Sequence, residues 1–492
     1  MTDEHPNIHA PEFPPGLDWV STAGPLTLES LRGKAVVLDF WTAGCINCLH
    51  VIPRLHELER RFPEDLVVIG VHAGKYPGER RTDAVRRAAD RLGVGHPVVN
   101  DRQFRIWKSY AVDAWPTIAL VSPEGMLVEL RSGEFDVESV AGAIEEIVSR
   151  SARAGTLRTG KLDFGRDPAG PPAPEGQLRY PGRVIAEGRR LFVADSGHHR
   201  VLELTEVPGE TEAALRYAVA RSWGSAAGFA GGDPSTALFA DPQGLATDGG
   251  SLYVADRANH AVREIDLSTG MVSTVAGTGA LADSRIVPGP ALDTALRSPW
   301  GIAVFDDDLC VSMAGSHQLW RMRLAEGFLS PLAGSGIEAL TDGPGPQATL
   351  AQPMGLSEGP GGLFFADAES SAVRALGPGS DARVDTLVGT GLFDHGDRDG
   401  SGDGVLLQHC EDLAFHRGRI LVADTYNHKI KSIDPATRRC HTLPGEAGSG
   451  ESLLHPSGIW ADEDRVLVAD TENHRIVTVD PADGSVHEIE ID

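Results

Sequence analysis

Two cysteines three positions apart are the residues of this sequence best suited to chemistry. Cys45 and Cys48 stand in the run VLDFWTAGCINC, which begins at Val37. The apolar residues before the pair predict a buried strand and the residues after it predict a helix, so the pair falls at a helix N-terminus. There the free N–H groups and the positive end of the helix dipole stabilise a thiolate. This arrangement predicts dithiol–disulfide exchange, in which Cys45 attacks a disulfide and Cys48 resolves the mixed disulfide.

Two other interpretations of the cysteine pair stay open. The pair could belong to a redox fold that has lost its activity. It could also be half of a zinc site, which would need a second cysteine or histidine pair at matching spacing. The remaining cysteines, Cys310, Cys410 and Cys440, stand singly in the other half of the chain, and we expect them to be buried small hydrophobic residues.

The first 153 residues alternate strand-like and helix-like segments. Apolar, β-branched runs predict strands over 34–40, 66–72, 117–122 and 126–131. Helical spacing of apolar residues predicts helices over 48–62, 82–92 and 137–148. Such alternation is typical of an α/β layered domain, which would hold the cysteine pair at the end of a central strand.

Residues 30–150 resemble a thioredoxin-like domain of the kind found in bacterial thiol reductases. Asp39 stands where these domains keep a buried carboxylate, and the resemblance implies that it accepts the proton of the resolving thiol. Pro53 matches the proline that kinks their active-site helix. Trp115-Pro116-Thr117 matches the loop whose cis-proline faces the cysteines and pairs with substrate backbone. The implied catalytic residues are Cys45, Cys48, Asp39 and Pro116.

Other positions depart from that pattern or favour a different reaction. The usual tryptophan before the first cysteine is Gly44 here, and the usual Gly-Pro between the cysteines is Ile46-Asn47. These positions tune thiol pKa, so the reduction potential stays open. Thr42 and Cys45 also match the Thr-x-x-Cys core of peroxiredoxins, although Leu38 stands where their proline belongs. A thiol peroxidase is therefore a lesser alternative.

The second half of the chain is repetitive. Residues 154–179 are rich in proline and glycine, which predicts a linker. Six copies of a strand–turn–strand unit then follow, beginning at Leu191, Leu252, Leu309, Leu363, Ile420 and Val466. With the flanking short strands each copy makes four strands, which is the pattern of a propeller blade. We predict a six-bladed all-β propeller over residues 180–492.

Three of these turns carry the motif D-x-x-N-H, beginning at Asp256, Asp424 and Asp470. The histidine position is also filled by His199 and His317, and by Ser371 in the fourth copy. On this motif the region is identified as a member of the NHL repeats. One histidine per blade cannot share a metal ion with its neighbours, so we expect His428 and His474 to bond the backbone of their own turns. The acidic loop over 394–403 has an EF-hand-like order from Asp397, but Gln408 stands where calcium needs a bidentate glutamate, which favours a solvated turn. We expect no metal, no other cofactor, and no convergent set of histidines and carboxylates in the propeller.

Charge and hydropathy exclude several classes of partner. The formal net charge is −26, and residues 154–492 carry 48 acidic and 27 basic residues, so we expect no nucleic acid and no membrane partner. No run of 18 apolar residues occurs, and the first residues lack the basic and apolar regions of a signal peptide, so we expect a cytoplasmic location. We also expect the chain to end on its last blade, without the further C-terminal β domain found in some proteins of this architecture.

A thioredoxin-like domain followed by an NHL propeller predicts a thiol–disulfide oxidoreductase whose propeller docks a protein client or reductant. The alternative is a non-enzymatic interaction scaffold that keeps a vestigial thioredoxin domain.

Overall fold

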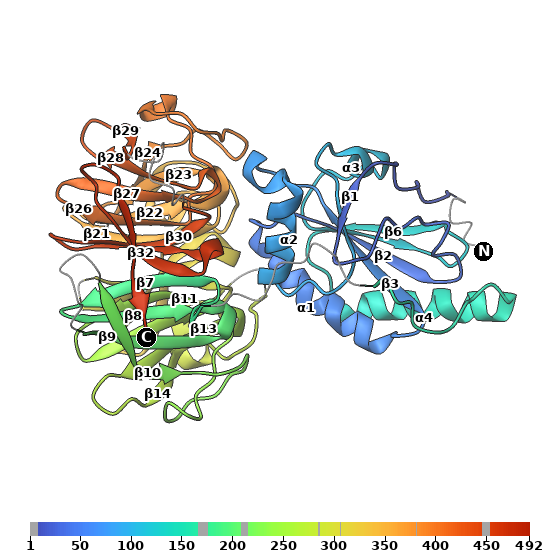
Figure 1. Cartoon of the computed structure of the whole chain (residues 1–492), viewed down its shortest axis with the longest axis horizontal. Helices are drawn as coiled ribbons and strands as arrows, with labels where there is room; N and C mark the ends of the chain where they lie inside the picture. Colours follow the sequence, from blue (N-terminus) through green and yellow to red (C-terminus); the bar gives the residue numbers. More distant parts are fainter. Residues whose placement is uncertain are drawn as a thin grey trace. The chain divides into compact units, whose positions relative to one another are not determined.

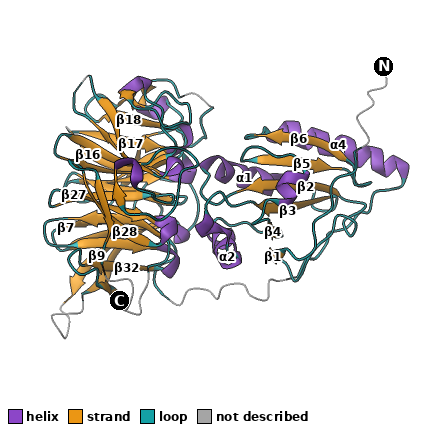
Figure 2. Ribbon diagram, turned by 90° about the horizontal axis from the view of Figure 1, so that it is seen from above, coloured by secondary structure: helices purple, strands orange, loops and turns teal. Residues whose placement is uncertain are grey.

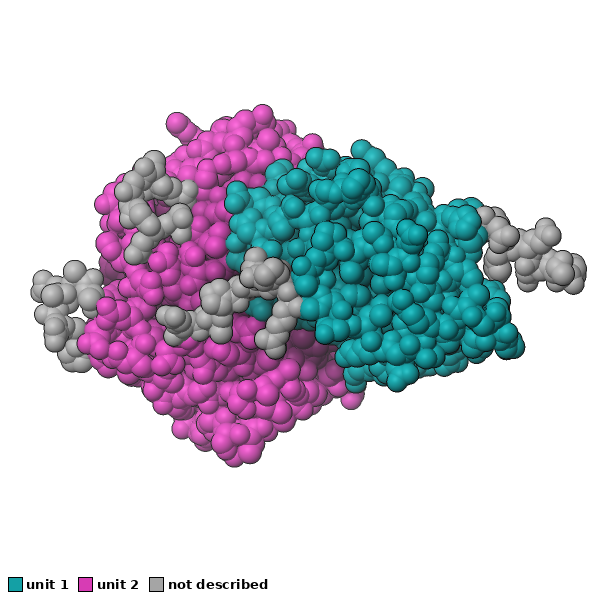
Figure 3. Space-filling model, turned by 45° about the vertical axis from the view of Figure 1, so that its right-hand side comes forward, with its two compact units in different colours: residues 1–173 teal, residues 174–492 magenta. Residues whose placement is uncertain are grey.

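The computed structural model describes residues 8–165, 176–207, 215–283, 286–305, 307–379, 381–444 and 453–492. The chain forms two compact units, residues 1–173 and 174–492, which are coloured separately in Figure 3. The boundary falls inside the predicted linker, of which residues 166–175 lie outside the described residues.

The first unit is a six-stranded sheet with helices on both faces (Figures 1 and 2). The strand order is β1-β4-β3-β2-β5-β6, in which β2, β3 and β4 are parallel and the other pairings are antiparallel. The strands are β1 Asp18–Val20, β2 Ala35–Trp41, β3 Leu66–His72, β4 Val98–Asn100, β5 Thr117–Val121 and β6 Leu127–Ser132. The helices are α1 Ile46–Arg61, α2 Thr82–Arg91, α3 Arg105–Ser109, α4 Val137–Ala154 and the 3-10 helix η1 Pro77–Arg80.

The predicted α/β layered domain is confirmed, with additions. The four predicted strands correspond to β2, β3, β5 and β6, and the three predicted helices to α1, α2 and α4. Strands β1 and β4 and helix α3 were not predicted. Each has only three to five residues, which is too short for a periodic hydrophobic pattern to show.

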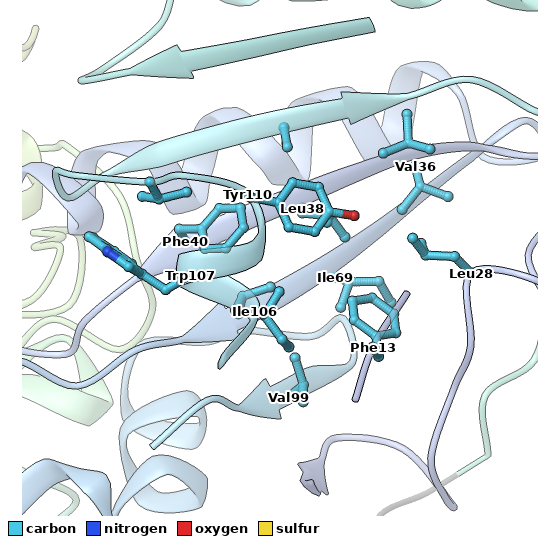
Figure 4. Packing of buried hydrophobic residues seen from close by; sticks show 14 of the residues in the cluster. Phe13, Leu28, Val36, Leu38, Phe40, Ile69, Val99, Ile106, Trp107 and Tyr110 are labelled. Carbon is cyan, nitrogen blue, oxygen red and sulfur yellow. The ribbon is translucent and has the colours of Figure 1, made fainter. Parts of the chain in front are cut away.

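Side chains of the central strand alternate between two cores because successive residues of a strand point to opposite faces. Val36, Leu38 and Phe40 of β2 enter the core shown in Figure 4, where Ile106 and Trp107 of α3 also pack. The intervening Ala35 and Val37 enter a second core, which α1 and α4 cover. The end of β2, where the cysteine loop begins, is thus held from both faces.

The first part of the predicted linker is packed against the first unit. The Arg158 N–H donates to the Gly33 carbonyl at 2.8 Å, and the Lys34 ammonium donates to the Gly160 carbonyl at 2.6 Å. The Thr22 hydroxyl donates to the Phe164 carbonyl at 3.0 Å. Residues 154–165 therefore belong to the packed first unit and do not act as a free linker.

The second unit is a six-bladed propeller, as predicted, and the four main strands of each blade pair antiparallel (Figures 1 and 2). The first three blades are β7 Pro181–Glu187, β8 Arg190–Asp195, β9 Arg200–Val207 and β10 Arg216–Trp223; β11 Pro242–Thr247, β12 Ser251–Asp256, β13 Ala261–Asp266 and β14 Val272–Ala276; and β16 Pro299–Phe305, β17 Asp308–Met313, β18 Gln318–Arg323 and β19 Phe328–Ala333.

The other three blades are β21 Pro353–Gly359, β22 Gly362–Asp367, β23 Ala372–Leu376 and β24 Arg383–Val388; β26 Asp412–His416, β27 Arg419–Asp424, β28 Lys429–Asp434 and β29 Arg439–Thr442; and β30 Pro456–Ala461, β31 Val466–Asp470, β32 Arg475–Val479 and β33 Val486–Glu488. Two-residue strands extend four of the sheets: β15 Gly289–Pro290, β20 Gly343–Pro344, β25 Gly400–Ser401 and β34 Glu490–Ile491. A 3-10 turn joins the second and third strands of every blade and carries the motif residues.

The motif aspartate holds the segment that leads into the first strand of its blade. In five blades its Oδ1 accepts the backbone N–H of the residue 16 positions earlier, always at 2.7 Å. In three blades a motif asparagine donates to its Oδ2, as Asn259 does to Asp256 at 2.8 Å. The aspartate and the asparagine thus do the local bonding that the sequence analysis had assigned to the histidine.

The motif histidines bond the next blade, so the prediction that they bond their own turns was wrong. The Nδ1 atoms of five histidines each accept a backbone N–H from the following blade at 3.0–3.2 Å, and the Ser371 hydroxyl oxygen does so in the fourth blade. The histidine has φ near +55°, and this left-handed conformation ends the 3-10 turn. That prediction rested only on neighbours in sequence. The histidine Nδ1 instead accepts a hydrogen bond across the seam, by which we mean the boundary between two successive blades.

The acidic loop of the fifth blade is also paired within the protein. Asp397 contacts Lys429 and Lys431, and Asp399 contacts Lys431 at 3.2 Å. These carboxylates neutralise a buried lysine, so the loop is not the freely solvated turn that we expected.

Substitution of a seam histidine should destabilise the propeller. His428→Ala removes the acceptor of the His455 N–H, and an unsatisfied buried donor costs roughly 1–3 kcal/mol. We expect the melting temperature of the second unit to fall by about 1–4 °C, extrapolating the size scaling of unfolding entropy. Calorimetry of the full chain measures this, with exposed His487→Ala as the control. An unchanged melting temperature would contradict the seam role.

Candidate active site

The two cysteines occupy the first turn of α1. Cys45 is the N-cap residue and is partly exposed, whereas Cys48 is fully buried one turn later. The Cys45 carbonyl accepts the backbone N–H of Cys48 at 3.1 Å and of Leu49 at 3.2 Å, which fixes the turn. An incoming disulfide therefore reaches Cys45 first, and Cys48 lies behind it.

Burial and two neighbours keep the Cys48 thiol protonated. Desolvation raises its pKa well above the ordinary value, and the Cys45 side chain and the charge of Asp39 raise it further. Cys48 thus needs a base before it can act as a nucleophile, because the thiolate is the reactive form.

Asp39 is placed to be that base. It lies on β2, is 1% exposed, and its Oδ1 has no hydrogen-bond partner among the described residues. Burial raises the pKa of its carboxyl group to about 7. At neutral pH this group holds and releases a proton close to the Cys48 thiol, whose pKa it perturbs.

The loop before β5 completes the surroundings of the cysteines. The Trp115–Pro116 peptide bond is cis. Trp115 and Cys45 both pack against one hydrophobic cluster, to which Cys48 and Trp41 belong. Pro53 lies inside α1. All four site residues named by the sequence analysis therefore fall in or directly beside the first turn of α1 and the ends of β2 and β5.

Glu79 is an important residue of this region that the sequence analysis missed. Its carboxylate accepts the Thr42 hydroxyl at 2.6 Å and the backbone N–H groups of Ala43 and Tyr76 at 3.0 and 2.9 Å. Burial alone would raise its pKa, but the charge of nearby His72, together with these donors, lowers it to about 2. Glu79 thus anchors the residues that lead into Cys45. The signal was weak, because a glutamate in the loop GKYPGERR resembles any surface charge.

The geometry of Thr42 favours exchange over peroxide chemistry. Its side chain is 1% exposed, and its hydroxyl donates to Glu79 while accepting the Lys75 N–H at 3.2 Å. The Thr-x-x-Cys match predicted a hydroxyl that orients a peroxide, whereas this hydroxyl is engaged in holding the loop.

In the propeller, two histidines and three glutamates from successive blades lie close to one another. His455 lies 3.2 Å from Glu411 and 3.7 Å from Glu472, and His409 lies 3.8 Å from Glu411 and 3.7 Å from Glu369. All five side chains are buried. These side chains meet because they occupy seam positions of successive blades, but within the described residues of the propeller no three of their ligand atoms lie close enough together to hold a metal ion. The expectation concerned a set able to hold a metal, and it stays a prediction.

No helix in the described ranges is long and apolar enough to cross a bilayer.

Comparisons with known proteins match both units. A Thioredoxin-like family model matches residues 33–127, and an NHL repeat model matches residues 239–265. NHL repeat-containing protein 2 of Bos taurus is 36% identical over 486 residues, and Protein SUPPRESSOR OF QUENCHING 1, chloroplastic, of Arabidopsis thaliana is 37% identical over 460 residues. The alignments cover 91% and 89% of this chain, which spans 65% and 43% of those relatives. The Thiol-disulfide oxidoreductase ResA of Bacillus thuringiensis is 30% identical over 122 residues, covering 25% of this chain and 68% of the relative.

Alkylation should distinguish the two cysteines. In the reduced protein at neutral pH, iodoacetamide should label Cys45 before Cys48, because Cys45 is partly exposed and the pKa of buried Cys48 is raised. Peptide mass spectrometry over time measures this, and the Cys45→Ser variant should take up little label. Faster labelling of Cys48 would contradict the assignment.

Asp39 should make stability depend on pH. Its pKa is about 7 when folded and has the ordinary value of 3.8 once the chain unfolds, so the unfolded chain releases its proton first as pH rises. The stability that the protonated carboxyl contributes is present below pH 3.8 and is lost as pH rises through 7. Asp39→Asn should therefore raise the melting temperature more at pH 8 than at pH 4, while exposed Asp113→Asn should not. An equal effect at both pH values would count against a buried, titrating Asp39.

Proposed function

We propose that this chain, which is a thioredoxin-like NHL repeat protein related to NHL repeat-containing protein 2, exchanges disulfides with a protein client through Cys45 and Cys48. One observation carries the proposal. A partly exposed thiol stands at the N-cap position of α1, a buried thiol lies one turn behind it, and a buried carboxyl group with a pKa of about 7 lies close to the buried thiol. Similarity of the first unit to thiol–disulfide oxidoreductases supports the same reaction.

The proposed reaction has two steps. The Cys45 thiolate attacks one sulfur of the client disulfide, which forms a mixed disulfide and releases the other client sulfur as a thiolate. Asp39 then takes the proton from Cys48, whose thiolate attacks the Cys45 sulfur. This releases the second client thiol and leaves a Cys45–Cys48 disulfide. Two electrons pass to the client, and an external dithiol reductant restores the pair.

Exposed apolar side chains support docking of a client by the propeller. Four loops that join one blade to the next each expose a large apolar residue, and these are Phe229, Val287, Ile337 and Phe393. Two of these loops lie beside the motif turns, because Asn259 and Asn427 donate to the carbonyls of Gly228 and Gly396. These residues occupy equivalent loops, and we assign them as the propeller rim that contacts a client.

A trapping experiment tests the proposal. Cys48→Ser should stop the reaction at the mixed disulfide, because the resolving thiol is gone, whereas Cys45→Ser should lower reduction of a small test disulfide to the uncatalysed rate. Non-reducing electrophoresis and mass spectrometry of the full chain measure both, with Cys440→Ala as a buried-cysteine control.

The same trap separates exchange from scaffolding. If wild-type protein reduces no disulfide at a cellular potential and Cys48→Ser traps none, exchange is wrong and the scaffold alternative stands. If a Phe393→Ser/Ile337→Ser variant of the trap still reacts with the small test disulfide but captures less client, the propeller rim is the docking surface. Unchanged capture would exclude that rim.

A further inference from the structure

A histidine–glutamate–histidine cluster lies on the first unit, away from the cysteines. His56 and Glu59 are one turn apart on α1, and His96 precedes β4. The potential ligand atoms of these three side chains all lie within 4.8 Å of one another. His96 Nδ1 lies 3.6 Å from Glu59 Oε1, and the two imidazole rings are 6.3 Å apart between centroids.

His96 is buried without the hydrogen bonds that a buried imidazole needs. Its side chain is 2% exposed, and within the described residues neither ring nitrogen has a hydrogen-bond partner. Nε2 lies against Gly70 of β3, so Nδ1 is the atom presented to Glu59. Buried polar atoms are nearly always satisfied, and one left open points to an ion or a water.

His56 presents a second imidazole to the same place. Its side chain extends from α1, and one of its ring nitrogens lies within 4.8 Å of the ligand atoms of Glu59 and His96. The Glu59 side chain is one-third exposed and free to rotate toward the two rings.

We propose that His56, Glu59 and His96 bind a divalent transition metal ion, with Zn²⁺ as the best-suited ion. Two imidazoles and one carboxylate form a known three-ligand zinc set, whose fourth position is taken by water or substrate. A tetrahedral ion with bonds of about 2.0–2.1 Å holds its ligand atoms roughly 3.3–3.5 Å apart. The His96–Glu59 separation is close to this already, and a small rotation of the α1 side chains brings in His56.

The surroundings leave room for a fourth ligand. The three residues line a cavity of about 780 Å³, with Arg60, Lys161 and Asp163 also on its wall. The cavity has the size of a small-molecule site. The charges of Arg60 and Lys161 suit an anionic fourth ligand better than a second cation.

The cluster is separate from the cysteine site. His56 is eight residues beyond Cys48, which is about 12 Å along a helix. The ion would tie α1 to the segment before β4. No metal was expected from the sequence, because Cys45 and Cys48 have no second ligand pair at matching spacing. Glu59 and His96 stand 37 positions apart and were not considered as ligands.

Metal titration of the full chain tests the proposal. The Cys45→Ser/Cys48→Ser background removes thiolates that would compete for zinc. In this background we expect one tightly bound Zn²⁺ per chain by isothermal titration. Glu59→Gln and His96→Gln should each weaken binding at least tenfold, with circular dichroism confirming that the variants fold.

Controls distinguish this cluster from other ligands. Glu57→Gln on the same helix and exposed His487→Gln should leave zinc affinity unchanged. Bound Co²⁺ should show the d–d spectrum of nitrogen and oxygen ligands without a sulfur charge-transfer band. Zinc binding that is absent, or equal in Glu59→Gln and the background, would overturn the proposal, as would a sulfur charge-transfer band.

Discussion

The propeller depends on carboxylates that have been removed from water. Burial raises the pKa of Asp256 to about 6 and of Asp424 to about 7, although each receives a backbone N–H, a side-chain amide and a cation. The cation is Arg263 in one case and Lys431 in the other, and both are themselves buried. In the third blade, Met313 stands at the position of the aspartate and Trp320 at the position of the cation, and both side chains are buried. A blade therefore has either both the buried carboxylate and its cation or neither of them, since a lone buried charge is costly.

The first unit uses the same physics for two different results. Glu79 lies among convergent donors, which lower its pKa to about 2 and make it a fixed anchor. Asp39 has no comparable set of donors, and burial raises its pKa to about 7. Two carboxylates of one small unit thus differ in protonation because of their hydrogen-bond partners. The anchor holds the loop before Cys45, and the titrating group lies close to the Cys48 thiol.

Features set by local sequence were predictable, and features set by contact across the fold were not. The strand β2, the helix α1, the cysteine pair, Asp39 and the six repeats follow from residue type, spacing and resemblance, and the structure has them at the expected places. Glu79 was missed because its partners lie 36 and 37 positions away, and the seam role of the histidines because each acceptor serves another blade. The His56, Glu59 and His96 set combines a helix with a loop beyond the next strand, which no local pattern marks.

Closure of the ring gives the second unit no terminal blade. His474 accepts the N–H of Tyr180, 294 positions earlier, and the C-terminal β34 pairs in parallel with β10 of the first blade. The seam between the last and first blades thus uses the same chemistry as the other five. In an open repeat array the end units fray first. Here, losing any one blade opens two seams at once, so unfolding is expected to involve the whole ring. Any of the six seams is then equivalent as the place where the first and last blades meet, and a circular permutant cut at another seam would keep every inter-blade contact.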